Sequence, residues 1–179
     1  MMVIADTTPI NYLLLIAEID LLFHLFSRII LPEGVLTELR HPKAPAVVRK
    51  WASALPAWVE VRHVRVPIEI QLQGLGPGES EAIALAEHLK PSLLLLDERK
   101  GYQVATERNI PVVGTLFVLE EAGTRGLTNL PRHSLNCNKR PFALHQSLFR
   151  RYSIAISCDR ASIDTRWRKK VESRVPTDW

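Results

Sequence analysis

Two aspartates each stand directly after a short apolar run. Asp6 follows Val-Ile-Ala at 3–5, and Asp97 follows four leucines at 93–96. Such runs predict strands that are buried on both faces, as in a parallel sheet. Open α/β sheets bind ligands in the crevice at the carboxyl ends of their strands. Because a carboxylate there is costly to desolvate unless it is paired or binds a metal, we expect Asp6 and Asp97 to share a cation.

The predicted helix at 78–89 offers a third carboxylate to the same edge. Glu79 is in register with Ile83 and Ala86 on the apolar face, whereas Glu81 lies off that face. An interaction with the helix dipole would account for either acid, but it does not explain why one of them faces inward. Glu79 is therefore the better candidate ligand.

The predicted helix at 33–41 offers a fourth, weaker candidate. Val35, Leu36 and Leu39 set its apolar face, and Glu38 lies on the border of that face. Taken alone, Glu38 is better interpreted as a solvated flanking residue.

Four carboxylates around one crevice would suit Mg²⁺ or Mn²⁺, which take oxygen ligands and keep several waters. A pair of such ions can activate a water and stabilise the leaving oxygen of a phosphodiester. The six histidines are scattered and form no obvious ligand pair. The two cysteines, Cys137 and Cys158, indicate neither a disulfide framework nor a zinc site, so a reducing cytoplasm is the expected compartment.

Strands alternate with helices along residues 1–131, which predicts right-handed crossovers and a three-layer α/β/α fold with a mainly parallel central sheet. Thr8 followed by Pro9 predicts the start of the first helix, and residues 62–76 are weakly patterned. The expected strands are 2–6, 28–31, 58–61, 92–97 and 111–113, and the expected helices are 9–17, 18–26, 33–41, 45–54, 78–89, 99–108 and 115–125.

Length and composition are those of one globular domain, with 179 residues of which 46% are apolar and 23% charged. The N-terminal apolar run is interrupted by Asn11, Glu18, Asp20 and His24, so we expect no transmembrane helix. The N-terminus also lacks the basic region and the cleavage site of a secretory signal.

Four segments resemble, in order, the acidic motifs of PIN-domain nucleases, and most closely those of the bacterial and archaeal branch related to VapC toxins. They are Val-Ile-Ala-Asp-Thr-Thr-Pro-Ile around Asp6, Leu-Thr-Glu-Leu around Glu38, Gly-Glu-Ser-Glu-Ala-Ile-Ala-Leu-Ala around Glu79, and Leu-Asp-Glu around Asp97. The resemblance runs through residues 1–130 and includes the strand and turn at 110–115. The spacing from Ala86 to Asp97 matches the family and assigns the third acid to Glu79.

The resemblance implies a Mg²⁺- or Mn²⁺-dependent endoribonuclease, usually paired with an antitoxin and often a homodimer. The implied metal ligands and catalytic residues are Asp6, Glu38, Glu79 and Asp97.

Four neighbouring residues are candidate substrate contacts. Thr7 and Thr115 could add hydroxyl contacts, with turn and N-cap roles as an equally good interpretation. Arg99 and Lys100 follow Asp97 and could contact phosphate, or could simply be solvated residues of a first helical turn.

Two other functions remain open. A phospho-acceptor signalling domain shares this fold class, but it would need two adjacent acids after the first strand and a lysine after the last, which this sequence lacks. A catalytically weak or inert PIN-like binding module is the stronger alternative. The third acidic position holds a glutamate instead of an aspartate, and this longer side chain could weaken the site.

Residues 132–179 differ sharply from the rest of the chain. They hold 11 Lys and Arg against 4 Asp and Glu, whereas residues 1–131 hold 12 against 15. A basic tail could meet nucleic acid, or it could be a solvated and disordered extension. Because the amphipathic segment common in the family is not evident here, we hypothesise an altered reading frame or a late replacement. Resequencing the coding region tests the first option, which fails if no family-like frame continues in another register.

Overall fold

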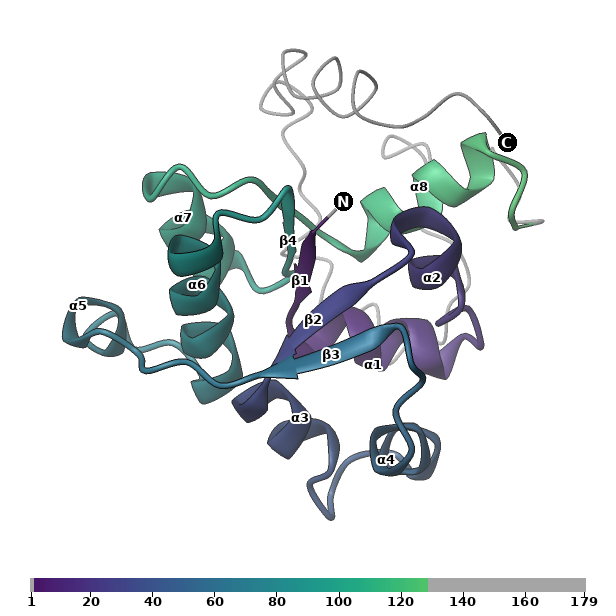
Figure 1. The fold of residues 1–179 in the computed structure, drawn as a ribbon, viewed down its shortest axis with the longest axis horizontal. Helices are drawn as coiled ribbons and strands as arrows, with labels where there is room; N and C mark the ends of the chain where they lie inside the picture. Colours follow the sequence, from purple (N-terminus) through teal and green to yellow (C-terminus); the bar gives the residue numbers. More distant parts are fainter. Residues whose placement is uncertain (1, 129–179) are drawn as a thin grey trace. The chain divides into compact units, whose positions relative to one another are not determined.

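A five-stranded parallel sheet forms the centre of the computed structural model, which describes residues 2–128 (Figure 1). The strands lie in the order β3-β2-β1-β4-β5, and every neighbouring pair is parallel. The strands are β1 (Val3–Ala5), β2 (Ile29–Pro32), β3 (Val59–Arg62), β4 (Leu93–Leu95) and β5 (Val112–Val113). This arrangement confirms the predicted three-layer α/β/α fold.

Helices cover both faces of the sheet. In Figure 1, α6 and α7 lie to the left of the strands, and α1, α2 and α8 lie to the right. The helices are α1 (Thr7–Leu15), α2 (Leu21–Phe26), α3 (Glu33–Leu39), α4 (Ala46–Ser53), α5 (Ile68–Gln71), α6 (Pro77–Leu89), α7 (Arg99–Glu107) and α8 (Thr115–Thr124). None of the helices described here is long and apolar enough to cross a membrane.

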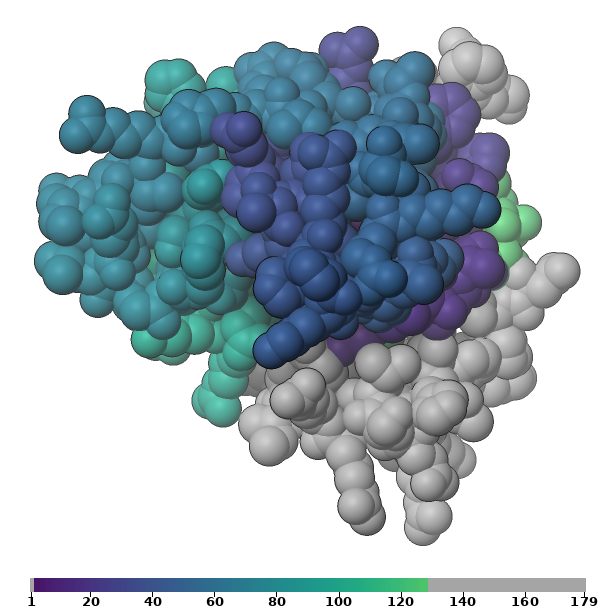
Figure 2. Space-filling model, turned by 90° about the horizontal axis from the view of Figure 1, so that it is seen from below, coloured from purple at the N-terminus to yellow at the C-terminus, as the bar shows by residue number. Residues whose placement is uncertain are grey.

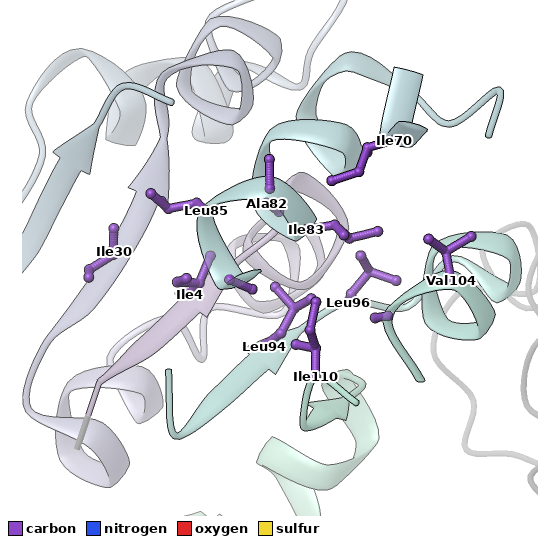
Figure 3. Packing of buried hydrophobic residues seen from close by; sticks show 13 residues of the cluster. Ile4, Ile30, Ile70, Ala82, Ile83, Leu85, Leu94, Leu96, Val104 and Ile110 are labelled. Atoms are coloured by element: carbon purple, nitrogen blue, oxygen red, sulfur yellow. The ribbon is translucent and has the colours of Figure 1, made fainter. Parts of the chain in front are cut away.

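The core on the α6 side is built from aliphatic side chains of the sheet and of three helices (Figure 3). Ile4, Ile30 and Leu94 contribute from three adjacent strands, and Ile83 of α6 packs onto them. Because successive strand residues alternate between the two faces, the apolar runs of these strands supply buried side chains to both faces of the sheet. This packing holds the N-terminus of α6 near the carboxyl ends of the strands.

Two local predictions need correction. Thr8 is not the cap of the first helix: α1 begins at Thr7, and the cap is Asp6, whose carboxylate accepts a hydrogen bond from the Thr8 N–H at 3.5 Å. Asp6 competes successfully for this position because its acceptor lies two residues before the free amide. The weakly patterned segment at 62–76 contains a short helix, α5, that the sequence pattern did not reveal.

The strand register brings the two aspartates to one edge. Ala5 pairs with Leu95, and the Asp6 N–H donates to the Leu95 carbonyl at 2.9 Å. Helix α3 begins directly after β2 at the same edge, and Figure 2 looks at the molecule from this side. The predicted domain boundary at 131 and the predictions for 132–179 lie outside the described residues.

The core predicts a measurable difference between two isoleucines. Ile83 is fully buried, whereas Ile68 of α5 is 58% exposed. Ile83→Ala leaves a cavity beneath α6, so we expect it to lower the free energy of unfolding by about 2–5 kcal/mol. Ile68→Ala is the matched control and should cost less than about 0.5 kcal/mol. Urea unfolding measures both, and equal losses would contradict this packing.

Candidate active site

Asp6 ends the central strand β1 and is almost completely buried. Its Oδ2 accepts the long hydrogen bond from the Thr8 N–H, while its Oδ1 is buried with no hydrogen-bond partner among residues 2–128. Burial is the main cause that raises the pKa of Asp6 from 3.8 to about 7. The backbone N–H of Thr7 opposes this rise, and the charges of Glu79 and Glu38 add to it.

Glu38 reaches the same edge from α3. Its Oε2 accepts a 2.5 Å hydrogen bond from the Thr7 hydroxyl, and its Oε1 accepts one of 2.8 Å from the Gly78 N–H. Gly78 lies in the first turn of α6, where backbone N–H groups have no partner within the helix. Glu38 is therefore not the freely solvated residue that its position on α3 alone suggested.

Glu79 lies in the first turn of α6 and is half-buried. Its Oε2 accepts a hydrogen bond of 3.0 Å from the N–H of Gly76, the residue that caps the helix. Its Oε1 is buried and lacks a hydrogen-bond partner in the described part of the chain. Burial raises the pKa of Glu79, the Gly76 N–H opposes this, and the charges of Glu98 and Glu38 raise it further.

Asp97 follows β4 and is held by a single residue. The Thr115 N–H donates to Oδ1 at 2.7 Å, and the Thr115 hydroxyl donates to Oδ2 at 2.5 Å. Desolvation raises the pKa of Asp97, the two bonds from Thr115 lower it, and the charge of Glu98 raises it. Although some surface of the residue remains exposed, both of its carboxylate oxygens are already bonded by the protein.

The structure brings three of the four predicted acids into mutual electrostatic contact. The charges of Glu38 and Glu79 act on Asp6, and the charge of Glu38 acts on Glu79. Within residues 2–128, no group of three or more acidic, histidine or cysteine side chains is arranged closely enough to hold a metal ion as it stands. Asp97 lies at the same sheet edge but is directed to Thr115.

The donor set nonetheless fits a hard cation. Asp6 and Glu79 each keep one buried carboxylate oxygen without a protein donor, and leaving such an atom unpaired is costly. Both acids also have raised pKa values because they are desolvated beside other acids. A divalent cation bound by oxygen would satisfy the two atoms and offset the repulsion.

The four candidate substrate contacts fall into two groups. Thr7 and Thr115 donate their hydroxyl groups to Glu38 and Asp97, so both bond to acids of the site. Lys100 is exposed, donates to the Gly74 carbonyl at 3.2 Å, and lowers the pKa of Glu79 by its charge. Arg99 is exposed in the first turn of α7.

Sequence reasoning set aside one acid that takes part in the arrangement. Glu81 is half-buried, and its Oε2 accepts a hydrogen bond of 2.7 Å from the Gly34 N–H in the first turn of α3. The helical periodicity of α6 placed Glu81 off the apolar face, but it could not show that a second helix packs there. The sequence signal that could have indicated this packing is a glycine in the first turn of each helix, Gly34 in α3 and Gly78 in α6.

Comparison with known proteins supports one family. A family model described as a PIN domain matches residues 2–139, which is more than two thirds of the chain. No curated protein sequence matches the chain significantly.

The buried position of Asp6 predicts how stability depends on pH when divalent ions are chelated. Between its ordinary pKa of 3.8 and about 7, the folded protein holds a proton that the unfolded chain releases. The free energy of unfolding should therefore fall as pH rises through this window, by on the order of 4 kcal/mol, and level off above it. Asp6→Asn should remove most of this fall.

Urea unfolding in chelator at about pH 5 and about pH 8.5 measures the upper part of this fall, about 3 kcal/mol. Glu69→Gln, which neutralises an exposed acid on α5, is the control and should keep the wild-type pH dependence. Parallel pH profiles for wild type and Asp6→Asn would contradict the prediction.

Proposed function

Because this chain belongs to the PIN-domain family, whose members are generally nucleases, we propose that it is a divalent-metal-dependent endoribonuclease. The chain would hydrolyse phosphodiester bonds of RNA, and Mg²⁺ or Mn²⁺ would be its cofactor. A relation to the VapC toxins is part of this proposal and rests on the four acidic motifs and their spacing.

One observation carries the proposal: the two carboxylates with an unpartnered buried oxygen lie within electrostatic range of each other. They are Asp6 and Glu79, and the described residues offer neither of these oxygens a donor. If these residues only stabilised the fold, we would expect paired or neutral groups here, because unpaired buried acids destabilise a protein. The arrangement is better explained by a positively charged ligand.

The residues would divide the work between them. Asp6 and Glu79 would bind the ion through their unpartnered oxygens, and Glu38 and Asp97 would complete the acidic set. The Thr7 hydroxyl and the Gly78 N–H would orient Glu38, since each bonds one of its oxygens. Thr115 would orient Asp97 in the same way.

A bound Mg²⁺ or Mn²⁺ would supply an activated water and stabilise charge on the phosphate and on the leaving oxygen. The chain's own contribution is to keep acceptor oxygens aimed at the end of the sheet. Such preorganisation removes part of the entropic cost of assembling the reacting groups. Lys100 and Arg99, exposed after β4, would attract the RNA phosphates.

The proposal extends to partners and compartment. We propose that the chain acts in the cytoplasm as a toxin whose activity an antitoxin protein restrains, and that it forms a homodimer. The four acidic motifs support this extension through their resemblance to the toxin branch. Pull-down of a tagged copy with the product of the neighbouring gene tests the antitoxin, and light scattering tests the dimer.

An inert PIN-like binding module is the second candidate, and a specific observation favours it. Both oxygens of Asp97 are occupied by Thr115, and both oxygens of Glu38 are also bonded by the protein. Acids that are satisfied in this way have less need of a cation. Such a protein would bind RNA or a protein partner without cleaving it.

An RNA cleavage assay with added Mn²⁺ separates the two functions. We expect wild type to cleave, and Asp6→Asn and Asp97→Asn to lose more than about 100-fold in rate, because residues that merely orient metal ligands already contribute 10- to 100-fold. Excess chelator should abolish wild-type cleavage.

Glu87→Gln serves as the matched control. Glu87 lies on α6 like Glu79, but near the opposite end of the helix, where it forms an ion pair with Arg108. This variant should cleave like wild type. If Asp6→Asn and Asp97→Asn also cleave like wild type, the metal-nuclease proposal is wrong, and if wild type binds RNA without cleaving it, the binding module is favoured.

A further inference from the structure

Helices α3 and α6 exchange carboxylate contacts in a reciprocal way, and from this we infer that Glu81 is a positioning residue for Glu38. Glu81 of α6 accepts the hydrogen bond of Gly34 in the first turn of α3. Glu38 of α3 accepts the hydrogen bond of Gly78 in the first turn of α6. The inference deepens the proposed function, because Glu38 belongs to the proposed metal site, but the exchange itself does not depend on a metal.

Each half of the exchange satisfies a backbone group that its own helix leaves free. The first N–H groups of a helix have no partner within the helix, and a carboxylate beside them is favoured by the helix dipole. The Gly34 N–H to Glu81 Oε2 distance is 2.7 Å, and the Gly78 N–H to Glu38 Oε1 distance is 2.8 Å. Bonds of this length with an ionised acceptor are the stronger kind.

Both contacts require glycine. A Cβ atom at Gly34 would lie 2.7 Å from Cδ and from Oε1 of Glu81. A Cβ atom at Gly78 would lie 2.8 Å from Oε2 of Glu38. Because real Cβ atoms do not approach other atoms so closely, any larger residue would push the facing carboxylate away.

The exchange matters for Glu38 because α3 is short. A helix of seven residues is only marginally stable by its own hydrogen bonds, so its position depends on packing. Val35, Leu36 and Leu39 anchor one side of α3 in the core, while Glu81 fixes its first turn against α6. With that turn fixed, Glu38, one turn further on, meets Gly78 and Thr7.

The simplest competing account is that Glu81 only caps α3 and contributes stability. The two accounts differ in what happens at the contact between Glu38 and Gly78. A cap affects Gly34 and the unfolding free energy, whereas a positioning residue also changes the contact between Glu38 and Gly78. The Gly78 amide is therefore the informative probe.

Backbone amide NMR spectra of the full-length, metal-free protein can report on both contacts. Glu81→Ala should shift the Gly34 amide resonance and also that of Gly78. Gly34→Ala should also shift the Gly78 amide resonance, without removing a charge, because its methyl group displaces the flexible end of Glu81. Glu81→Gln keeps an acceptor oxygen and should retain the wild-type Gly78 resonance.

Mn²⁺ binding to the same proteins is the second measurement, followed by electron paramagnetic resonance. We expect Glu81→Ala and Gly34→Ala to weaken Mn²⁺ binding by about 10-fold, and the double variant to be no weaker than either, since both break one contact. Glu81→Gln should stay within about 3-fold of wild type. Glu87→Ala, on the same helix but paired with Arg108, is the control and should bind like wild type.

The outcomes separate this inference from the proposed function. If Glu81→Ala shifts the Gly34 amide but leaves Gly78 and Mn²⁺ binding unchanged, Glu81 is a cap only and the inference is overturned. The same holds if Glu87→Ala weakens binding equally. If wild type binds no Mn²⁺, the proposed function fails, while the Gly78 amide still decides whether Glu81 positions Glu38. If Glu81→Ala fails to fold, the same measurements on Gly34→Ala, which breaks the contact, and Glu81→Gln, which keeps an acceptor oxygen, decide the question.

Discussion

The cost of burying ionised carboxylates governs the carboxyl edge of this sheet. Each acid placed there must find a donor, and the donors within reach are mostly backbone N–H groups at the starts of helices. The amides of Gly34, Gly76, Gly78 and Thr115 serve Glu81, Glu79, Glu38 and Asp97 in turn. Helices α3, α6 and α8 are thus oriented by the same contacts that satisfy the acids, which couples the packing of the domain to the site.

Glycine makes these contacts close. Of the glycines in residues 2–128, five would place a Cβ atom within 3.3 Å of a carboxylate, and three of them lie against Glu38 or Glu79. Gly101 of α7 adds to the pattern, since its Cβ would lie 2.6 Å from the unpartnered Oε1 of Glu79. Gly76 and Gly78, at the start of α6, are consequently explained by carboxylate packing. At these two positions glycine lets an acid approach the backbone, whereas Gly74 has a positive φ of 62°, which favours glycine.

Much of this arrangement follows from local patterns in the sequence. Apolar runs predicted β1 and β4 and placed Asp6 and Asp97 at one edge, and helical periodicity chose Glu79 in α6. Contacts between helices did not follow, because periodicity describes one helix at a time. Glu38 looked solvated and Glu81 looked irrelevant until α3 was seen to pack on α6. The capping role of Asp6 was missed for a related reason: Thr8 and Pro9 form a good local start, but a buried acid two residues earlier accepts from the Thr8 N–H, and the helix begins at Thr7.

The acids differ in how completely the protein satisfies them, and this difference has a chemical meaning. Glu38 and Asp97 have donors on both oxygens, so their geometry is fixed before any ligand arrives. Asp6 and Glu79 each have one bonded oxygen and one without a donor in the part of the chain described, so each is oriented and still has an acceptor to offer. A site whose acids were all saturated would bind a cation weakly, and one with no internal donors would lack fixed geometry. The observed mixture combines fixed positions with two acceptor oxygens that the described residues leave without a donor, and a hard, oxygen-seeking cation of the kind we propose would use both features.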